Sequence, residues 1–475
     1  MVIHKTTYLI DQLNRYAGMI FITILGAVIL SCPASRDKKS PRLSGSTDLD
    51  ISGLNGSNPL SVKDDESAGV DAEGAQLKEE LRIGDEVPLE TGNMEIFFNA
   101  LTDLSNGKRD KVRVIHYGDS HTAADFFTTA VRRKLQQRFS DGGRGFVLLG
   151  NPWRSYNPKD LETVVTGNWT PERILIAADP AILDGYYGLA GITTETTDKF
   201  ARSIVKTSGE FGFGKNASLF DLFYLTQPDG GSFSVLADGK QKGFINTKSP
   251  KKRTGFFSVK VKNGPHEFEV RTSGDGEVRL FGAAVESDKG LVYDTLGVNG
   301  GFFNTPHRWN EEELQKQIQR RDPQLLVTMY GTNETGSRVL TRQNYKSDVL
   351  KTMNKFKGGL NDASCLMFGP PDSNTDMDKQ ERLSLIIDVQ KEVADEMGCL
   401  FIDLREMMGG EGSHLRWEQT TPAMAQPDGI HLTVKGYMFL GELAADRILA
   451  AYDNYISGRT GEEPEADTDK KQGQK

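Results

Sequence analysis

The chain has 475 residues and a net charge of −9, and 37% of its residues are hydrophobic. This length is sufficient for two or three domains. The acidic balance excludes a protein that binds nucleic acid through its phosphates, because such binding needs a dominant basic surface. The three cysteines and seven histidines form no cluster with metal-ligand spacing, so we expect no metal and no cofactor.

Residues 1–32 have the pattern of an export segment. Basic residues precede an apolar run, Met19 to Leu30, that is short for a membrane span. The sequence Ile29-Leu30-Ser31-Cys32 resembles a bacterial lipobox, in which the cysteine is diacylated and becomes the mature N-terminus. We therefore expect a protein of the cell envelope or periplasm that is lipid-anchored to a membrane at Cys32. The alternative is an uncleaved signal anchor, since basic residues on both sides of the run do not decide its orientation.

Two segments have the composition of disordered chain. Residues 33–88 are rich in Ser, Gly, Asp and Glu with scarcely any aromatic residues, so they cannot bury enough apolar surface to offset the entropy of ordering. They are predicted to be a flexible linker. Residues 458–475 are predicted to be a disordered tail for the same reason.

Residues 89–164 begin the folded part of the chain. A helical pattern at Met94–Leu101 precedes an apolar strand at Val112–His116, and Gly118-Asp119-Ser120-His121 follows directly. The spacing of apolar residues predicts a helix at Phe127–Phe139, and Thr122 with Asp125 resembles the capping box that would begin it. Ser120 is thus expected at a strand-to-helix turn, close to a helix N-terminus that favours developing negative charge.

Between residues 165 and 287 the pattern changes to short alternating strands separated by Gly, Pro, Asn and Asp turns. Such a region predicts an inserted antiparallel β-sandwich. An insertion that only frames a cleft, without binding a ligand, is the alternative. The aromatic residues of this region and its borders could contact a sugar or belong to the core; they are Trp153, Trp169, Tyr186 and Tyr187. The basic run Lys251-Lys252-Arg253 is interpreted as a solvated hairpin tip.

Strands and helices alternate again from residue 288 to 457, which indicates a parallel sheet covered on both faces. Two motifs fall at or just past strand ends, where open α/β sheets place their ligand sites, and a third lies near the end of the chain. They are Gly297-Val298-Asn299-Gly300, Gly331-Thr332-Asn333-Glu334 and Asp428-Gly429-Ile430-His431.

Together the four motifs contain the parts of a serine esterase. A serine hydroxyl such as that of Ser120 becomes nucleophilic when an imidazole, here His431, takes its proton, and a carboxylate, here Asp428, orients that imidazole. The oxyanion of acyl transfer needs fixed donors. Gly300 can supply a backbone N–H, Asn333 a side-chain amide and Ser120 a further backbone N–H. We expect Ser120 Oγ and the His431 ring to lie about 2.6–3.2 Å apart, with Asp428 at the other ring nitrogen.

The order Ser, Gly, Asn and Asp-x-x-His resembles the GDSL/SGNH hydrolase superfamily. Val114-Ile115-His116-Tyr117-Gly118-Asp119-Ser120-His121, followed by Ala124-Asp125-Phe126-Phe127, is similar to bacterial peptidoglycan O-acetylesterases. His121 replaces the usual leucine, which fits those esterases, and Glu334 replaces the usual aspartate. The resemblance implies a three-layer α/β/α hydrolase domain with a parallel sheet, interrupted by a carbohydrate-binding-like β-sandwich.

The expected function is that of an exported serine O-acetylesterase whose partner is an acetylated glycan, with peptidoglycan as the leading substrate. An O-acetyltransferase shares the same catalytic groups, and another acetylated polysaccharide could be the substrate. An inactive wall-binding protein is the alternative of another class. Two further expectations concern single residues. His121 is assigned a structural or substrate-contact role, and Cys365 and Cys399 lie in apolar runs that favour buried free thiols over a disulfide.

Overall fold

The computed structural model describes residues 81, 92–153, 156–174, 184–209 and 211–460, all of which belong to one compact unit, Asp50–Lys475. The predicted export segment, nearly all of the predicted linker and the end of the predicted tail lie outside the described residues. Within those ranges, no helix combines the length and apolar character that a membrane crossing requires.

A parallel sheet of five strands forms the centre of the fold, in the order β13-β1-β14-β15-β16. All four neighbouring pairs are parallel, which confirms the predicted α/β class. The side chains of β14 and β15 are buried throughout, as expected for strands covered on both faces. The strands are β1 (Lys111–Gly118), β13 (Gly290–Gly297), β14 (Leu325–Met329), β15 (Ser364–Phe368) and β16 (Leu400–Ile402).

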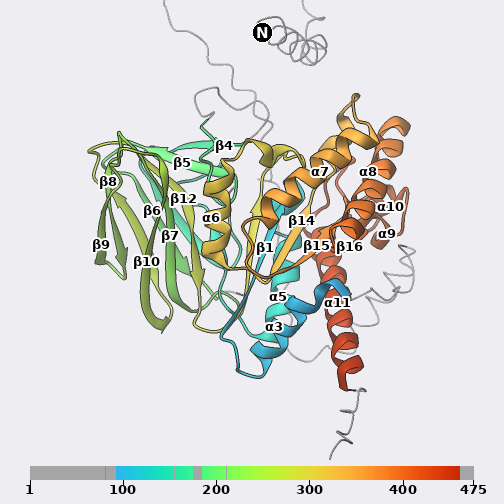
Figure 1. The fold of residues 1–475 in the computed structure, drawn as a ribbon, viewed down its shortest axis with the longest axis horizontal. Helices are drawn as coiled ribbons and strands as arrows, with labels where there is room; N and C mark the ends of the chain where they lie inside the picture. The colour runs from blue at the N-terminus through green and yellow to red at the C-terminus, as the bar shows by residue number, and fades with distance from the viewer. Residues whose placement is uncertain (1–80, 82–91, 154–155, 175–183, 210, 461–475) are drawn as a thin grey trace, which may run out of the picture. The chain divides into compact units, whose positions relative to one another are not determined.

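Helices cover both faces of this sheet (Figure 1). On one face lie η2 (Gly92–Met94), α3 (Glu95–Ser105), α5 (Phe127–Phe139), α9 (Leu404–Met407), α10 (Ser413–Glu418) and α11 (Val434–Thr460). The other face packs against α6 (Glu311–Arg321), α7 (Arg342–Lys357) and α8 (Met377–Glu396). Side-chain caps begin these last three helices, since Asn310, Thr341 and Asp376 each accept a hydrogen bond from a first-turn backbone N–H.

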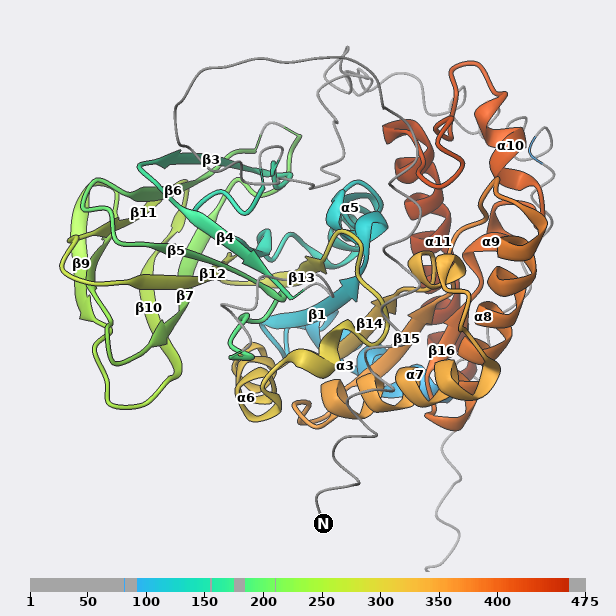
Figure 2. The same cartoon turned by 90° about the horizontal axis from the view of Figure 1, so that it is seen from above.

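Two antiparallel sheets are formed by the chain between α5 and β13. The inner sheet has the order β10-β7-β12-β5-β4, with β2 paired to β12, and the outer sheet has the order β3-β6-β11-β8-β9. Figure 2 shows both sheets beside the parallel sheet. Their strands are β2 (Gly145–Val147), β3 (Leu161–Thr166), β4 (Thr170–Arg173), β5 (Ile192–Thr196), β6 (Arg202–Thr207), β7 (Ala217–Thr226), β8 (Ser232–Ala237), β9 (Lys240–Asn246), β10 (Arg253–Gly264), β11 (Glu267–Thr272) and β12 (Val278–Glu286).

The inner sheet packs against other elements on both of its faces, and its strand β12 is buried throughout. One face packs against the outer sheet, where the rings of Phe220 and Phe268 stack with centroids 4.9 Å apart. Its other face contributes Phe223 and Phe281 to the core that contains Ile115 of β1. The first strands of the sandwich begin before the predicted boundary at residue 165, since β2 covers Gly145–Val147 and β3 begins at Leu161. The sandwich is therefore joined to the α/β part by a shared hydrophobic core.

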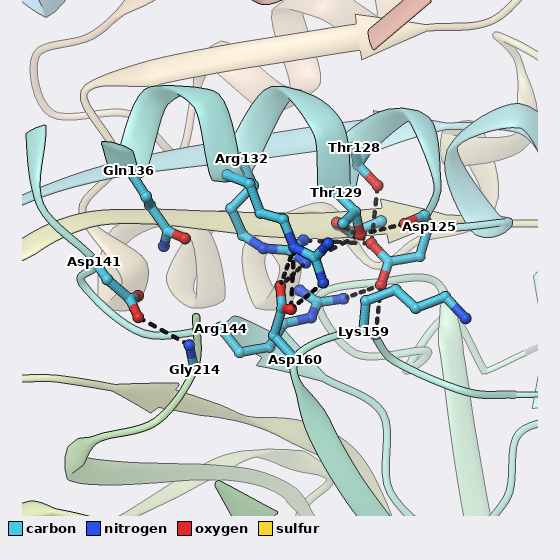
Figure 3. Close-up of polar contacts among 12 residues, drawn as sticks. Asp125, Thr128, Thr129, Arg132, Gln136, Asp141, Arg144, Lys159, Asp160 and Gly214 are labelled. Atoms are coloured by element: carbon cyan, nitrogen blue, oxygen red, sulfur yellow. Dashed lines mark hydrogen bonds and ion pairs between the residues drawn. The ribbon is translucent and has the colours of Figure 1, made fainter. Parts of the chain in front are cut away.

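A buried ionic cluster connects α5, β13 and the sandwich (Figure 3). The Asp125 carboxylate accepts hydrogen bonds from Arg144 at 2.8 Å, Thr128 at 2.9 Å and Thr295 of β13 at 3.1 Å. Arg132 lies 3.4 Å from Asp125 and 2.7 Å from Asp160. Burial opposes ionisation of Asp125, but Arg144 and Arg132 hold its pKa well below the usual range.

The predicted capping box is wrong. The Asp125 backbone adopts a positive φ of 57°, and its carboxylate is directed to the cluster of arginines. The short helix α4 (Ser120–Ala123) is instead capped by Asp119, which accepts a hydrogen bond from the His121 N–H. The sequence pattern failed here because a buried ion pair competes for the carboxylate that would have capped α5.

The predicted free thiols are also wrong, since Cys365 and Cys399 form a disulfide. Cys365 lies on β15, and Cys399 immediately precedes β16, the strand paired with β15. Parallel pairing places the two Cα atoms 4.7 Å apart, within the range that a disulfide spans. The sequence showed that both residues are apolar in context but not that their strands are neighbours.

We predict that the cluster around Asp125 stabilises the fold strongly. Asp125→Ala leaves the buried Arg144 without its carboxylate partner and leaves Arg132 with Asp160 alone. We therefore expect the free energy of unfolding, measured by urea denaturation, to fall by about 3–5 kcal/mol. Glu392→Ala is the matched control, because Glu392 forms exposed pairs with Arg342 and Lys346. The control should leave the urea midpoint nearly unchanged; equal losses in both variants would contradict the assignment.

Candidate functional site

Ser120 lies at the turn between β1 and α4, at the carboxyl end of the strand that pairs with both β13 and β14. A Cβ at Gly118 would overlap Thr122 Oγ1 and lie 2.7 Å from the Met329 carbonyl, so only glycine allows the chain to turn here. The Asp119 N–H donates to the same carbonyl at 3.2 Å. These contacts fix the turn, and they leave Ser120 7% exposed.

The structure brings Ser120, His431 and Asp428 into one hydrogen-bonded series. Ser120 Oγ lies 3.0 Å from His431 Nε2, and His431 Nδ1 lies 2.7 Å from Asp428 Oδ2. The expected contacts between these side chains are therefore present. A carboxylate can only accept, so the contact with Asp428 assigns the ring proton of His431 to Nδ1. The other ring nitrogen, Nε2, is then the acceptor for the Ser120 hydroxyl.

Asp428 is held in its ionised form. Partial burial raises its pKa, but hydrogen bonds from the His431 ring and from two backbone N–H groups lower it by more, so the pKa lies well below its usual range. The backbone donors are Ile430 and His431, each 2.9 Å from Oδ1. The carboxylate thus keeps its charge through neutral and mildly acidic pH, and the backbone of its own loop fixes its direction.

His121 packs behind the site rather than facing solvent. Its side chain is buried, its Nδ1 lies 2.8 Å from the Tyr437 hydroxyl, and its ring centroid lies 5.4 Å from that of His431. Burial lowers the pKa of His121, and His431 lowers it further, so the ring is neutral. Of the two roles expected for His121, the burial favours the structural one.

The predicted oxyanion donors lie on two loops at the same sheet edge. Gly300 follows β13 with a φ of 74°, and the Val298 N–H donates to the Gly118 carbonyl at 2.9 Å, which places this loop beside the serine turn. Asn333 begins η5 (Asn333–Gly336) after β14. The structure shows one hydrogen bond of Asn333 that was not predicted. Its Nδ2 donates to the Gly301 carbonyl at 2.9 Å. An amide carries two N–H bonds, and this contact uses one of them.

Two buried carboxyls that sequence reasoning missed lie close behind these loops. Asp119 is 1% exposed, and burial raises its pKa to about 7. Glu334 is 5% exposed, and burial, with a contribution from Asp119, raises its pKa to about 8. Glu334 Oε1 accepts a hydrogen bond from the Phe303 N–H at 2.7 Å. The motif positions of both residues signal a function, but nothing in the pattern indicates a shared buried environment.

The other aromatic and basic candidates have structural contacts. Tyr187 is 1% exposed, Trp169 packs against the core of the sandwich, and Trp153 contacts Tyr156 edge-to-face with centroids 4.8 Å apart. Lys252 pairs with Asp184 at 2.7 Å. In the part of the chain that the structure describes, no group of three or more His, Cys, Asp and Glu residues could hold a metal ion.

Comparison with known proteins adds a family and a fold. Residues 264–439 match the model of the GDSL-like Lipase/Acylhydrolase family. A solved peptidoglycan O-acetylesterase is similar with a TM-score of 0.62 at 20% identity, covering 76% of this chain and 96% of that chain. A lipase/acylhydrolase from Enterococcus faecalis has a TM-score of 0.27 at 19% identity, covering 36% and 78%. No curated protein matches the chain. The first structure shows that its fold is shared over three quarters of the chain.

The raised pKa of Asp119 predicts a pH-dependent stability. Between its unfolded pKa near 3.8 and its folded pKa of about 7, the folded state binds the proton and the unfolded state does not, so stability falls as pH rises through this window. Asp119→Asn keeps an acceptor for the His121 N–H and removes the titration. Relative to the variant, the wild type should lose up to about 4 kcal/mol of unfolding free energy between pH 4 and pH 7. Urea denaturation at several pH values tests this, and a pH-independent difference would refute it.

Proposed function

We propose that this chain, whose residues 264–439 match the GDSL-like Lipase/Acylhydrolase family, is an exported serine O-acetylesterase. It removes acetyl groups from a cell-surface glycan, with peptidoglycan as the leading substrate. The observation that carries the proposal is the hydrogen-bonded series Ser120–His431–Asp428 at the carboxyl edge of a parallel sheet. This is the arrangement that activates a serine for acyl transfer.

In the first step the Ser120 oxygen attacks the acetyl carbonyl carbon while His431 Nε2 takes the hydroxyl proton. Asp428, held ionised by its backbone hydrogen bonds, stabilises the imidazolium that forms. The tetrahedral intermediate then releases the sugar oxygen, which receives the proton from His431, and the acetyl group stays on Ser120. Water, deprotonated by His431, attacks the acyl-enzyme and releases acetate, which restores the serine.

The negative charge of each tetrahedral intermediate needs donors beside Ser120. The proposed donors are the backbone N–H groups of Ser120 and Gly300 and the second N–H of the Asn333 amide. Support comes from the two loops, since Val298 ties one to Gly118 and Asn333 contacts Gly301. Donors held by such contacts need little rearrangement when the charge appears.

Three observations support an acetylated glycan outside the cytoplasm as substrate. The fold is shared with a peptidoglycan O-acetylesterase over 76% of the chain. A β-sandwich, an architecture suited to sugar binding, packs on the catalytic part. The disulfide between Cys365 and Cys399 is typical of an oxidising compartment, in agreement with the export pattern at residues 1–32 and lipid attachment at Cys32.

Substitutions in the site test the esterase chemistry. Ser120→Ala should remove nearly all acetyl-ester hydrolysis, a loss of about four or more orders of magnitude in kcat, because the nucleophile is gone. Asn333→Ala should slow hydrolysis by about a hundredfold or more, because an oxyanion donor is lost. The measurement is acetate release from an activated acetyl ester, with circular dichroism to confirm folding. Acetate release that does not depend on Ser120 would sink the proposal.

Acceptor competition separates hydrolysis from acetyl transfer. With an activated acetyl ester as donor, adding chitooligosaccharide should leave the acetate yield nearly unchanged if water is the natural acceptor. A transferase would divert acetyl to the glycan at an unchanged rate of acyl-enzyme formation. Acetate release from acetylated sacculi, compared with acetylated soluble glycans, then tests the substrate, and a preference for the soluble glycans would exclude peptidoglycan.

A further inference from the structure

Two consecutive side chains of η5 hold the loop that follows β13. We call residues Gly300–Phe303 the oxyanion loop, because it begins with the proposed donor Gly300. The Asn333 amide donates to the Gly301 carbonyl at 2.9 Å, and the Phe303 N–H donates to Glu334 Oε1 at 2.7 Å. The loop is thus held near both of its ends by neighbouring residues of one motif.

The two ends of the oxyanion loop differ in how firmly they are anchored. Phe303 is buried against Tyr330, with ring centroids 5.0 Å apart, and its carbonyl accepts from the Thr352 hydroxyl. Gly300 is exposed and has a positive φ. At the exposed end the Gly301 N–H donates to the Val298 carbonyl at 2.9 Å and the Gly301 carbonyl accepts from Asn333. The position of Gly300 therefore depends on these contacts together with the direction in which the chain leaves Phe303, where Glu334 accepts from the backbone N–H.

Besides the Phe303 N–H, the Glu334 carboxyl accepts a hydrogen bond only from its own backbone N–H among the described residues. It is buried, and its second oxygen, Oε2, has no hydrogen-bond partner among the described residues. Burying a carboxyl with an unused oxygen is costly, so the Phe303 contact is the visible reason for an acid at this position. Strand β14 and the short helix η5 place the side chain, and the residue is 5% exposed.

We propose that Glu334 is a positioning residue that, through the Phe303 N–H, fixes the oxyanion loop so that the Gly300 N–H faces the reacting oxygen. This inference rests on the proposed esterase function. Glu334 does not touch the substrate in this role. It acts through the backbone of three residues, and its contribution belongs to the transition state because the oxyanion exists only there.

The reach of the side chain decides the role. An aspartate is one C–C bond shorter, about 1.5 Å, so its oxygen would lie beyond hydrogen-bond distance of the Phe303 N–H without movement of η5. A glutamine has the same reach and keeps a carbonyl oxygen as acceptor. Burial raises the pKa of Glu334 to about 8, and the charges of Asp119 and Asp348 contribute to the rise. The carboxyl is therefore largely neutral at neutral pH, so the exchange to glutamine removes little charge.

The test compares Glu334→Asp with Glu334→Gln in steady-state hydrolysis of an activated acetyl ester. We expect the aspartate variant to lose about a hundredfold in kcat, as a displaced catalytic group does, with KM nearly unchanged. The glutamine variant should stay within a few fold of wild type. Binding of an alkylboronate, a tetrahedral mimic of the intermediate, should weaken in parallel with kcat only in the aspartate variant.

Two controls separate this inference from folding and from the esterase proposal itself. Thermal unfolding of both variants reports on the fold, and hydrogen exchange of a peptide covering residues 299–305, measured in the Ser120→Ala background, reports on the loop without any turnover. Faster exchange in the aspartate variant alone supports the contact even if the chain hydrolyses no ester. Wild-type kcat in Glu334→Asp, or equal losses in both variants, would overturn the inference.

Discussion

The whole site depends on the parallel pairing of β1 with β13 on one side and β14 on the other. The register places Gly118 opposite Gly297 and Met329, so the three strands end together. The loops that carry Ser120, Gly300 and Asn333 consequently leave the sheet at one edge, and two backbone hydrogen bonds extend the pairing past the strand ends. A long insertion separates β1 from β13 in sequence, yet their pairing brings the loops together. Asp428 and His431 come from a different part of the chain, the segment before α11.

The pKa values of the three carboxyls in the site are shifted in opposite directions. Asp428 is partly exposed and receives hydrogen bonds from one ring and two backbone groups, which favour its charge. Asp119 and Glu334 are buried, and burial disfavours theirs. In the proposed mechanism the His431 imidazole becomes cationic. Full charge on all three carboxyls beside it would raise the pKa of the imidazolium and hinder transfer of its proton to the leaving group. When Asp119 and Glu334 are neutral, they still accept hydrogen bonds from the loops but add no negative charge beside His431.

The sequence predicted that the motif loops after β1, β13 and β14 lie at one edge of the sheet, because the ends of parallel strands share an edge. Ser120, His431 and Asp428 meet as predicted. The contacts of Asn333 with Gly301 and of Glu334 with Phe303 were missed, because they join loops whose separation depends on three-dimensional packing. The disulfide was missed for a related reason, since strand order, not strand identity, makes Cys365 and Cys399 neighbours. Asp125 was misassigned because a local capping pattern cannot show distant arginines.

The inner sheet belongs to two cores at once, and this limits how the chain can be divided. On β7, Phe223 packs in the core that contains Ile115 of the parallel sheet, and Phe220 packs in the core shared with the outer sheet. A sandwich expressed without the α/β part would expose the apolar face that carries Phe223. The α/β part expressed alone would expose the core residues that pack against that face. The sandwich and the α/β part are therefore not independent modules that recombination can exchange. Mutations accumulating in either part act on a common stability reserve, so the two parts are constrained to evolve together.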